Sequence, residues 1–493
     1  MRLAHIFAFA RDGRRDSLRA VCASPSTDTI VALATPAGAS AIAVLRVSGP
    51  LVADFSRTLF SVALKPRQTR TVRYRDLARN AFLDTVVAVC FEAPASYTGE
   101  DVLEISCHGN PFIARRLIDD LCARGCRLAQ PGEFTQRAFL GGKLDLSQAE
   151  AVMDVIRARS DRALAAAQQQ LEGSLGRHLS RLNGELLDAL ARVEAYIDFP
   201  DEDLPAEDRS IVRGAVESVL EGTRRLLATQ RYGEILRTGI RTVIVGAPNA
   251  GKSSLLNRMV GYERAIVSPE PGTTRDFIEE NIHAGAHLVR LIDTAGLNPS
   301  PGEIERMGIE KTHERMKAAD LVLWVIDLSA PIPPLPRDVV AAMATATILV
   351  VGNKADLVSP ERAANALSPD ALETAGFSEA SARRVKTFIV SAQSGEGVPA
   401  LMGGIEGTAE SYLVQTGDEV IAVNARHAQA LERAGTSLEA ALGLLRPDAQ
   451  PPSPPELVAS DLREALEALG EIQGKFDNER MLDRLFATFC IGK

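Results

Sequence analysis

The sequence has few of the features that would place the protein in a membrane or let it coat a nucleic acid. A membrane-spanning helix needs about 18 to 20 consecutive apolar residues, and the closest stretch, Val31 to Val47, is interrupted by Thr35, Pro36 and Arg46. Positive charge is also scarce, because 55 Lys and Arg stand against 64 Asp and Glu and give a formal net charge of -9. Binding a nucleic acid by bulk electrostatics requires clustered cations. We therefore expect no membrane span, and any nucleic-acid contact must be local or supplied by a partner.

Cysteine is sparse as well, with six residues scattered along the chain, of which only Cys122 and Cys126 lie close together. Because no second pair and no nearby histidine accompanies them, we expect reduced thiols in the cytoplasm and no zinc site. Cys490 stands where a prenylation box would begin. Gly492 occupies an aliphatic position of that box and the chain ends in Lys493, so we do not expect lipidation.

Residues 1–26 are rich in arginine and contain three serines. This composition weakly resembles an organellar transit peptide, which makes a mitochondrial location the alternative to the cytoplasm. Two acidic residues and a poor amphipathic pattern argue against that alternative. We therefore expect a disordered extension.

The remaining chain is too long for one hydrophobic core and combines α/β with all-α patterns. Short apolar runs with Gly and Pro punctuation predict an N-terminal α/β domain over residues 27–145. Helical periodicity, including a leucine stripe, predicts a helical segment over 146–237, and helices return over 409–493. Between them, residues 238–408 alternate strand-like and helical runs, as a doubly wound parallel sheet requires. Each helical segment is thin, so we expect one discontinuous helical domain into which the sheet domain is inserted.

The start of the first helical segment is marked by Ser147 and Glu150, which have the spacing of a capping box. This pattern predicts that the helix opens with Ser147 as its cap.

A phosphate-binding loop is predicted by "GAPNAGKS", residues 246–253, between a strand-like run and a helix-like run. Glycines let backbone N–H groups point at phosphates, Lys252 adds a positive charge, and Ser253 is a magnesium ligand. The alternative interpretation is a glycine-rich turn.

Four further motifs support nucleotide binding: "GTTRD" with Thr274 as a second magnesium hydroxyl, "DTAG" from Asp293, "NKAD" ending in Asp356, and "SAQSGEG" from Ser391. A carboxylate at Asp356 can accept two N–H bonds from guanine that adenine does not offer, so the motifs predict GTP. The predicted nucleotide-binding residues are Asn249, Ala250, Gly251, Lys252, Ser253, Ser254, Ser268, Gly272, Thr273, Thr274, Asp293, Thr294, Ala295, Gly296, Asn353, Lys354, Asp356, Ser391, Ala392 and Gln393.

Hydrolysis needs a residue other than the one that follows "DTAG", because that residue is Leu297, which cannot orient water. Glu305 is the nearest carboxylate able to position a water as an acid or base, and a solvated helix residue is the alternative. We expect Lys252 and Glu305 to be catalytic residues, together with Asn249, which resembles a residue that binds a potassium ion in related GTPases.

The whole arrangement resembles one family, the tRNA uridine-modification GTPase family MnmE (TrmE). The resemblance covers residues 27–493. It rests on long strings, which are "DTIVALATPAGASAIAVLRVSG", "SYTGEDVLEISCHGNP", "PGEFTQRAFLGGKLDLSQAEAVMDVI", "IDFPDED", the nucleotide motifs and the terminal "LFATFCIGK".

The resemblance implies an N-terminal fold that binds a tetrahydrofolate derivative, either 5-formyl or 5,10-methylene, and that pairs two chains into a homodimer. At matching positions the folate contacts are Arg46, Glu104, Lys143 and the terminal Lys493, and each would otherwise be taken for a surface charge. Cys490 is a possible catalytic thiol, and a buried, inert cysteine is the alternative.

The resemblance also implies a reaction and its partners. With the flavoprotein MnmG (GidA), which carries FAD, the family adds an aminomethyl or carboxymethylaminomethyl group at C5 of the wobble uridine, position 34, of certain tRNAs. GTP hydrolysis in the family is stimulated by K⁺ and needs Mg²⁺. The potassium positions correspond to Asn249, Ser268, Glu270 and Thr273, and the magnesium positions to Ser253 and Thr274. The alternatives are a regulatory GTPase of ribosome assembly without folate chemistry and a folate-dependent transferase with an accessory GTPase.

The chain departs from the family pattern in places. Two prolines stiffen "SPEPGTTRD", and Asn298 and Gln393 replace residues that are commonly arginine or lysine. Asn110 stands where glycine is usual, and we expect it to adopt a left-handed backbone conformation. Residues 66–75, "PRQTRTVRYR", could contact RNA, although an ordinary exposed strand is the simpler interpretation.

Overall fold

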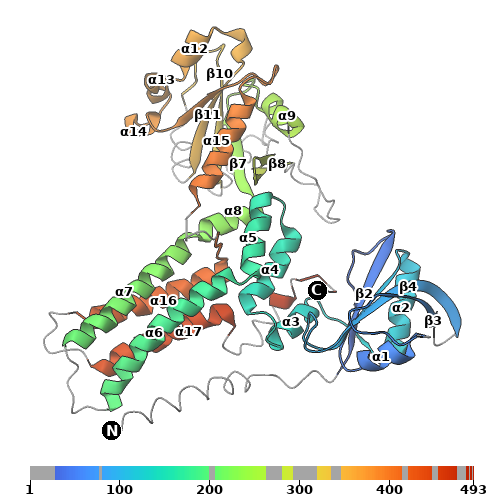
Figure 1. Ribbon diagram of the computed structural model, residues 1–493. Helices are drawn as coiled ribbons and strands as arrows, with labels where there is room; N and C mark the ends of the chain where they lie inside the picture. The colour runs from blue at the N-terminus through green and yellow to red at the C-terminus, as the bar shows by residue number, and fades with distance from the viewer. Residues whose placement is uncertain are drawn as a thin grey trace, which may run out of the picture. The chain divides into compact units, whose positions relative to one another are not determined.

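The computed structural model describes residues 28–60, 62–76, 80–198, 206–262, 280–292, 319–334, 346–413, 420–446, 454–474, 485–487, 489–490 and 492. The chain, whose helices and strands are shown in Figure 1, forms two compact units. Unit 1 comprises residues 1–153 and 470–493, and unit 2 comprises residues 154–469. Among the helices described, none is long and apolar enough to cross a membrane.

Unit 1 is built on a mixed sheet with the strand order β3-β4-β5-β2-β1-β6. Neighbouring strands run antiparallel except β1 and β6, which are parallel. Helices α1 and α2 bury their apolar residues against this sheet in one core. The strands are β1 (Ile30–Leu33), β2 (Ile42–Ser48), β3 (Arg70–Asp76), β4 (Ala81–Phe91), β5 (Val102–His108) and β6 (Arg127–Leu128), and the helices are α1 (Val52–Thr58), α2 (Pro111–Ala123), α3 (Glu133–Leu140) and α4 (Leu146–Arg157), whose last residues belong to unit 2.

Two local predictions in unit 1 are wrong. Asn110 has an extended backbone, with φ -96° and ψ 119°, and caps α2 by accepting a hydrogen bond from the N–H of Phe112. Helix α4 is capped by Asp145, whose Oδ1 accepts the N–H of Gln148 at 2.8 Å while Gln148 Oε1 accepts the N–H of Asp145 at 3.0 Å. The capping box therefore begins two residues earlier than Ser147, because α4 begins at Leu146 and Ser147 already lies inside the helix.

The end of the chain belongs to unit 1. Phe486 and Phe489 are buried against Leu146, Ala149 and Met153 of α4. The carbonyl of Cys490 accepts a hydrogen bond of 3.4 Å from the N–H of Gly132. A Cβ added at Gly492, where φ is +94°, would lie 2.3 Å from the carbonyl oxygen of Leu33 in β1.

Unit 2 contains long helices that precede its sheet in the sequence and others that follow it. Helix α7 packs beside α6 and α16 (Figure 1), and Arg224 of α7 pairs with Glu439 of α16 at 2.8 Å. The leucine stripe predicted on α6 is buried. The helices are α5 (Asp161–Leu171), α6 (Ser174–Asp198), α7 (Ala206–Ala228), α8 (Gln230–Thr238), α16 (Ala425–Leu444) and α17 (Pro455–Gln473), which ends in unit 1.

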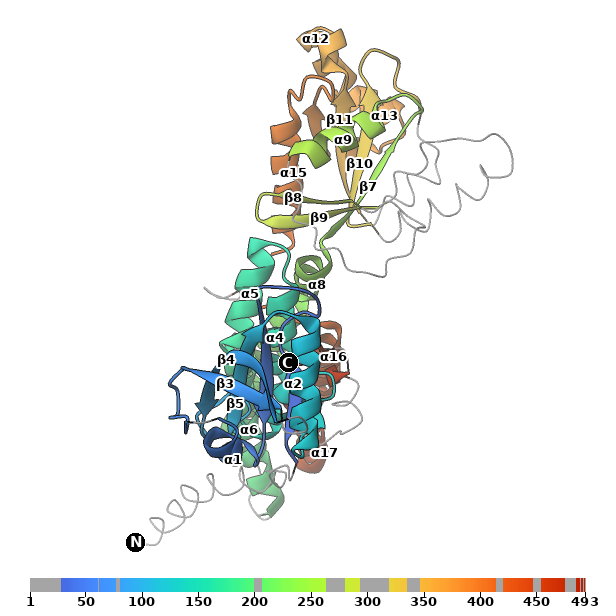
Figure 2. The ribbon, with the colours of Figure 1, turned by 90° about the vertical axis from the view of Figure 1, so that its right-hand side faces the viewer.

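The sheet of unit 2 has the order β12-β11-β10-β7-β9-β8, and every described pair is parallel except β8 with β9. Helices α9 and α15 share one core with the sheet, and α12, α13 and α14 share a second core with it (Figure 2). The elements are β7 (Ile240–Gly246), α9 (Lys252–Tyr262), β8 (Glu280–Ala284), β9 (His287–Ile292), β10 (Leu321–Asp327), β11 (Thr347–Asn353), η3 (Ala355–Leu357), α12 (Pro360–Ala366), α13 (Pro369–Thr374), α14 (Glu379–Ala382), β12 (Lys386–Ile389) and α15 (Val398–Ser411).

The predicted fold class, α/β combined with an all-α part and an inserted doubly wound sheet, is confirmed. The predicted boundaries at residues 145, 237 and 408 stay predictions. Ligands of such sheets bind at the carboxyl ends of the strands, where the strand order reverses. In unit 2 that place is the end of β7.

Candidate functional site

The loop between β7 and α9 has the backbone that a phosphate-binding loop needs. Gly246 has φ +155°, and a Cβ added there would lie 2.3 Å from the carbonyl oxygen of Val325 in β10. Gly251 has φ +89°, and a Cβ there would lie 2.2 Å from Nδ2 of Asn353. Asn249 is left-handed at φ 62°. Only glycine fits at residues 246 and 251. The loop leads directly into the N-terminus of α9, where backbone N–H groups attract anions.

Lys252 is the first residue of α9, and its side chain lies back across this loop. Its Nζ donates to the carbonyls of Gly246 at 3.0 Å and Ala247 at 2.9 Å. Burial lowers the pKa of the Lys252 ammonium below its ordinary value. A half-buried cation held over a loop of backbone donors is suited to neutralise the charge of phosphate groups.

Asn353 joins the phosphate loop to the loop that starts at Ser391. It is buried at the end of β11, and its Nδ2 donates to the carbonyl of Ala250 at 2.9 Å. Its Oδ1 accepts the N–H of Ala392 at 3.0 Å. Ser391 Oγ donates to Asp356 Oδ1 at 2.6 Å and so orients that carboxylate. The phosphate end and the base end of the site are therefore one hydrogen-bonded assembly.

Two residues of this assembly were not predicted from the sequence. Asp327, at the end of β10, accepts a hydrogen bond of 2.6 Å from Lys354, whose backbone is left-handed at φ 65°. Burial alone would raise the pKa of Asp327, but hydrogen bonds from Lys354 and Ser329 outweigh it and hold the pKa below its ordinary value. Arg258 of α9 donates to the carbonyls of Ala392 and Gln393. The position of Asp327 at the end of an apolar strand is a signal that sequence reasoning could have used.

The structure gathers part of the predicted nucleotide site at the carboxyl edge of the sheet. The predicted residues placed there are Asn249, Ala250, Gly251, Lys252, Ser253, Ser254, Asn353, Lys354, Asp356, Ser391, Ala392 and Gln393. Those outside the described residues are Ser268, Glu270, Gly272, Thr273, Thr274, Asp293, Thr294, Ala295, Gly296 and Glu305.

In unit 1, Arg46 and Glu104 are brought together. They are cross-strand partners on β2 and β5, and Nη2 and Nε of Arg46 donate to Glu104 Oε1 at 2.8 and 2.9 Å. The guanidinium carbon of Arg46 lies 5.3 Å from the ring centroid of Tyr97 and 5.8 Å from that of Phe134. These distances are within the range of cation–π attraction. The result is a half-buried charged pair against an aromatic wall.

The other predicted residues of this region are only partly placed. Lys143 Nζ donates to the carbonyl of Pro94 at 3.0 Å, which ties it to the segment that carries Tyr97. Lys493 lies outside the described residues. Cys490 is exposed, so the expectation that it is buried is wrong, and its role as a catalytic thiol stays a prediction.

A buried ion-pair network close to this pair was also missed. Arg137 of α3 bonds to Glu133 at 2.9 Å, to Glu100 at 3.1 Å and to Asp28 at 2.8 Å. Burial would raise the pKa of Glu133, but hydrogen bonds from Arg127 and Arg137 keep it below its ordinary value. The spacing of Glu133 and Arg137, four residues apart in the segment that forms α3, was the available signal.

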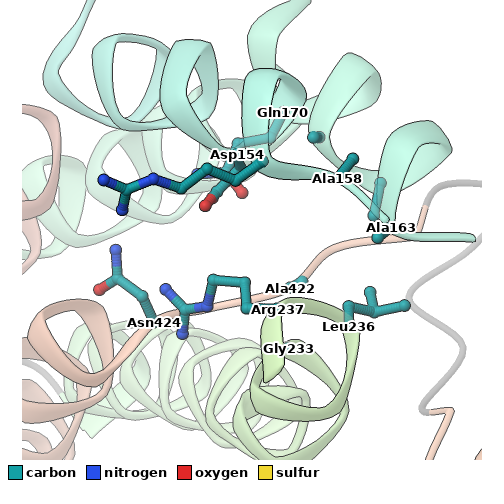
Figure 3. A pocket seen from close by; sticks show the side chains of 12 residues that line it. Asp154, Ala158, Ala163, Gln170, Gly233, Leu236, Arg237, Ala422 and Asn424 are labelled. Atoms are coloured by element: carbon teal, nitrogen blue, oxygen red, sulfur yellow. The ribbon is translucent and has the colours of Figure 1, made fainter. Parts of the chain in front are cut away.

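A separate cavity of about 170 Å³ lies in the helical part of unit 2. Figure 3 shows Asp154 and Gln170 on one side of it and Arg237 and Asn424 on the other. Most of its remaining wall is alanine, and none of its residues was predicted to be functional.

The doubly wound sheet, with this loop at the end of its first strand, defines a P-loop nucleotide-binding protein. Comparison with known families narrows the class. Residues 29–143 match the family model described as GTP-binding protein TrmE N-terminus, and residues 146–490 match the model described as MnmE helical domain.

Several similar proteins carry the name tRNA modification GTPase MnmE, including the following three. The one from Opitutus terrae is 54% identical over 470 residues, covering 95% of this chain and 100% of that protein. The one from Akkermansia muciniphila is 43% identical, covering 94% and 99%. The one from Aquifex aeolicus is 40% identical, covering 94% and 100%. The chain belongs to the MnmE family of tRNA modification GTPases.

Proposed function

We propose that the protein hydrolyses GTP and couples this hydrolysis to modification of the wobble uridine of certain tRNAs in the cytoplasm. The observation that supports this most is the pair of hydrogen bonds made by the Asn353 side chain. One joins it to Ala250 of the phosphate loop and the other to Ala392 of the base loop. These bonds preorganise the phosphate loop and the base loop relative to each other. Membership of the family supplies the tRNA context.

The described residues fit a guanine nucleotide. Asp356 already accepts a bond from Ser391 on Oδ1, which leaves Oδ2 and the second lone pair of Oδ1 for the two N–H groups of guanine. Lys252 would exchange its loop carbonyls for phosphate oxygens. Ser253, together with Thr274, would hold Mg²⁺, which neutralises the charge that develops on the phosphates.

Hydrolysis would depend on a monovalent cation, since Leu297 cannot orient water. Asn249, with its left-handed backbone, would present its side-chain oxygen to K⁺ together with Ser268, Glu270 and Thr273. Glu305 would position the attacking water. A fixed cation beside the phosphates stabilises the charge of the transition state as an arginine does in other GTPases.

The cluster in unit 1 fits a tetrahydrofolate derivative, which supplies a one-carbon unit. Both bonds from Arg46 fall on Glu104 Oε1, which leaves Oε2 to accept N–H groups of a pterin. The half-buried Tyr97 provides an apolar surface for its ring. Lys143 and Lys493 would bind the carboxylates of the glutamate tail, and the exposed Cys490 is available as a thiol. The protein would act as a homodimer with the FAD-carrying flavoprotein MnmG (GidA).

Nucleotide turnover tests the first half of this proposal. The native chain should hydrolyse GTP faster in K⁺ than in Na⁺, and Lys252→Ala should lose turnover in both salts. Asn249→Ala should remove the difference between the salts while keeping GTP binding. A native chain with equal rates in K⁺ and Na⁺ would exclude the potassium mechanism.

Folate binding and tRNA analysis test the second half. The native chain should bind labelled 5-formyltetrahydrofolate, and Arg46→Ala or Lys143→Ala should weaken this binding without changing GTP turnover. In cells whose only copy carries Lys252→Ala, the wobble modification should be absent although folate still binds. Absence of folate binding by the native chain would favour the regulatory GTPase of ribosome assembly.

A further inference from the structure

The loop predicted to recognise guanine contains no cation of its own. Residues 391–397 read "SAQSGEG" and carry Glu396 as their single charge. Their backbone is closed on itself, because the N–H of Ser391 donates to the carbonyl of Glu396 at 2.9 Å and the N–H of Gly395 donates to the carbonyl of Ser391 at 2.8 Å. Its orientation relative to the phosphate loop must be fixed by residues outside it.

Arg258 is such a residue. Its Nε donates to the carbonyl of Ala392 at 2.9 Å, and its Nη2 donates to the carbonyl of Gln393. A Cβ added at Gly395 would lie 3.8 Å from the guanidinium, so the side chain runs along the loop. Arg258 lies on α9, the helix that begins with Lys252. The phosphate-binding helix therefore holds the base loop directly.

Two bonds to consecutive carbonyls fix two consecutive peptide planes. In a planar trans peptide the carbonyl points opposite to the N–H of the following residue. Because Arg258 holds the carbonyls of Ala392 and Gln393 toward α9, the N–H groups of Gln393 and Ser394 point away from it. Ser394 N–H donates to Ser391 Oγ at 3.1 Å, whereas the Gln393 N–H has no hydrogen bond to any residue that the structure describes. A backbone donor is thus presented on the face of the loop that points away from α9.

We propose that Arg258 is a positioning residue for base recognition, which orients the N–H of Gln393 toward the O6 atom of guanine. This inference rests on the proposed binding of GTP and adds a specificity determinant to that site. Asp356 recognises the N–H groups of guanine, and the loop held by Arg258 recognises the acceptor. Adenine carries an amino group in place of O6, so its N–H would face the backbone N–H of the loop, and neither group could accept a hydrogen bond from the other.

The test compares nucleotides that differ at one atom. In 6-thio-GDP, sulfur replaces O6 and accepts hydrogen bonds weakly, while the N–H groups that Asp356 binds are unchanged. Arg258→Ala should raise the Kd for GDP roughly 10-fold and the Kd for 6-thio-GDP less than about 2-fold. KM for GTP should rise by the same factor as the Kd for GDP, with kcat within about 2-fold of native. Arg258→Lys, which can reach one carbonyl, should give an intermediate Kd.

The matched control is Arg383→Ala. Arg383 is an exposed arginine of the same sheet domain that pairs with Glu379 at 2.8 Å on α14, and its loss should leave every Kd unchanged. Equal affinity of native and Arg258→Ala chains for GDP would overturn the inference, and so would equal losses for GDP and 6-thio-GDP, which indicate general loosening. If the native chain binds no GDP at all, the proposed function fails first. Thermal unfolding of each variant confirms that it is folded.

Discussion

At the scale of single residues, the nucleotide site depends on a glycine at residue 251, where there is no room for a side chain. Gly251 lies where any side chain would push Nδ2 of Asn353 away from the carbonyl of Ala250. That bond holds the phosphate loop and the base loop together. A methyl group at residue 251 would therefore damage both ends of the site at once.

We expect Gly251→Ala to weaken GDP binding by at least about 100-fold, because a non-glycine residue at φ +89° is strained and its Cβ would displace Asn353. Titration with a fluorescent GDP measures the loss. Gly261→Ala is the control, since a Cβ added at that glycine of α9 meets no atom within 4 Å. It should bind GDP as the native chain does. Normal binding by Gly251→Ala would contradict the role assigned to this glycine.

The sequence predicted these glycines, Lys252 and Asp356 because local spacing fixes their roles. It could not predict Arg258, since an arginine in a helix has no distinctive spacing and its partners are backbone carbonyls more than a hundred residues away in sequence. The prediction for Asn110 failed because it considered only the backbone. A left-handed conformation was expected because glycine is usual at this position, whereas the asparagine side chain caps α2 from an extended backbone.

At the scale of elements, the hairpin of β8 and β9 connects the sheet to the helices of unit 2. The carbonyl of Arg159 lies 2.8 Å from His283 Nε2, and the N–H of Arg162 donates to the carbonyl of Ala286 at 3.3 Å. His287 is buried beside α8, with its Nε2 3.2 Å from the hydroxyl of Tyr232. Its Nδ1 has no hydrogen-bond partner among the described residues. The neutral imidazole of His287 is therefore buried where the β8–β9 hairpin packs against the helices of unit 2.

This buried imidazole predicts a pH dependence of stability. Burial lowers the pKa of His287, Glu410 and Glu406 of α15 act to raise it, and Arg162 of α5 acts to lower it further. Below about pH 6.5 the unfolded chain binds a proton at this histidine that the folded chain does not. The free energy of unfolding should therefore rise with pH through this range and level off above it.

We expect His287→Phe to reduce the difference in unfolding free energy between pH 5.5 and 7.5 by about 1 kcal/mol, which thermal unfolding at both pH values measures. His283→Gln, on the same hairpin and partly exposed, is the control and should keep the native difference. An unchanged difference in His287→Phe would show that another group titrates.

Elements with a strong period were predictable, and their caps were less so. The leucines of α6 recur on one face and are buried as expected. The cap of α4 was misplaced because both Asp145 and Ser147 can begin a capping box in this sequence, and only the observed start of the helix at Leu146 decides between them.

At the scale of the whole molecule, the chain returns to its beginning. Residues 470–493 belong with residues 1–153 in one compact unit, although more than three hundred residues separate them. The rings of Phe486 and Phe489 lie 5.2 Å apart and fill a core against α4. The family resemblance predicted that the tail takes part in the folate site, but periodicity alone could not, because the tail is short and its partners are distant in sequence.

This arrangement predicts that one substitution in the tail can weaken the proposed folate site without changing the nucleotide site. Phe486 is 2% exposed, so Phe486→Ala should destabilise unit 1 by about 3 to 5 kcal/mol by leaving a cavity against α4. The tail would then undock, carrying Cys490 away from Gly132, and folate binding should fall while the Kd for GDP stays native because the nucleotide edge lies wholly in unit 2. Phe112→Ala, at a site 68% exposed on α2, should change neither. Parallel loss of GDP affinity in Phe486→Ala would mean that the tail also supports the nucleotide site, whereas retained folate binding would mean that the tail is not needed there.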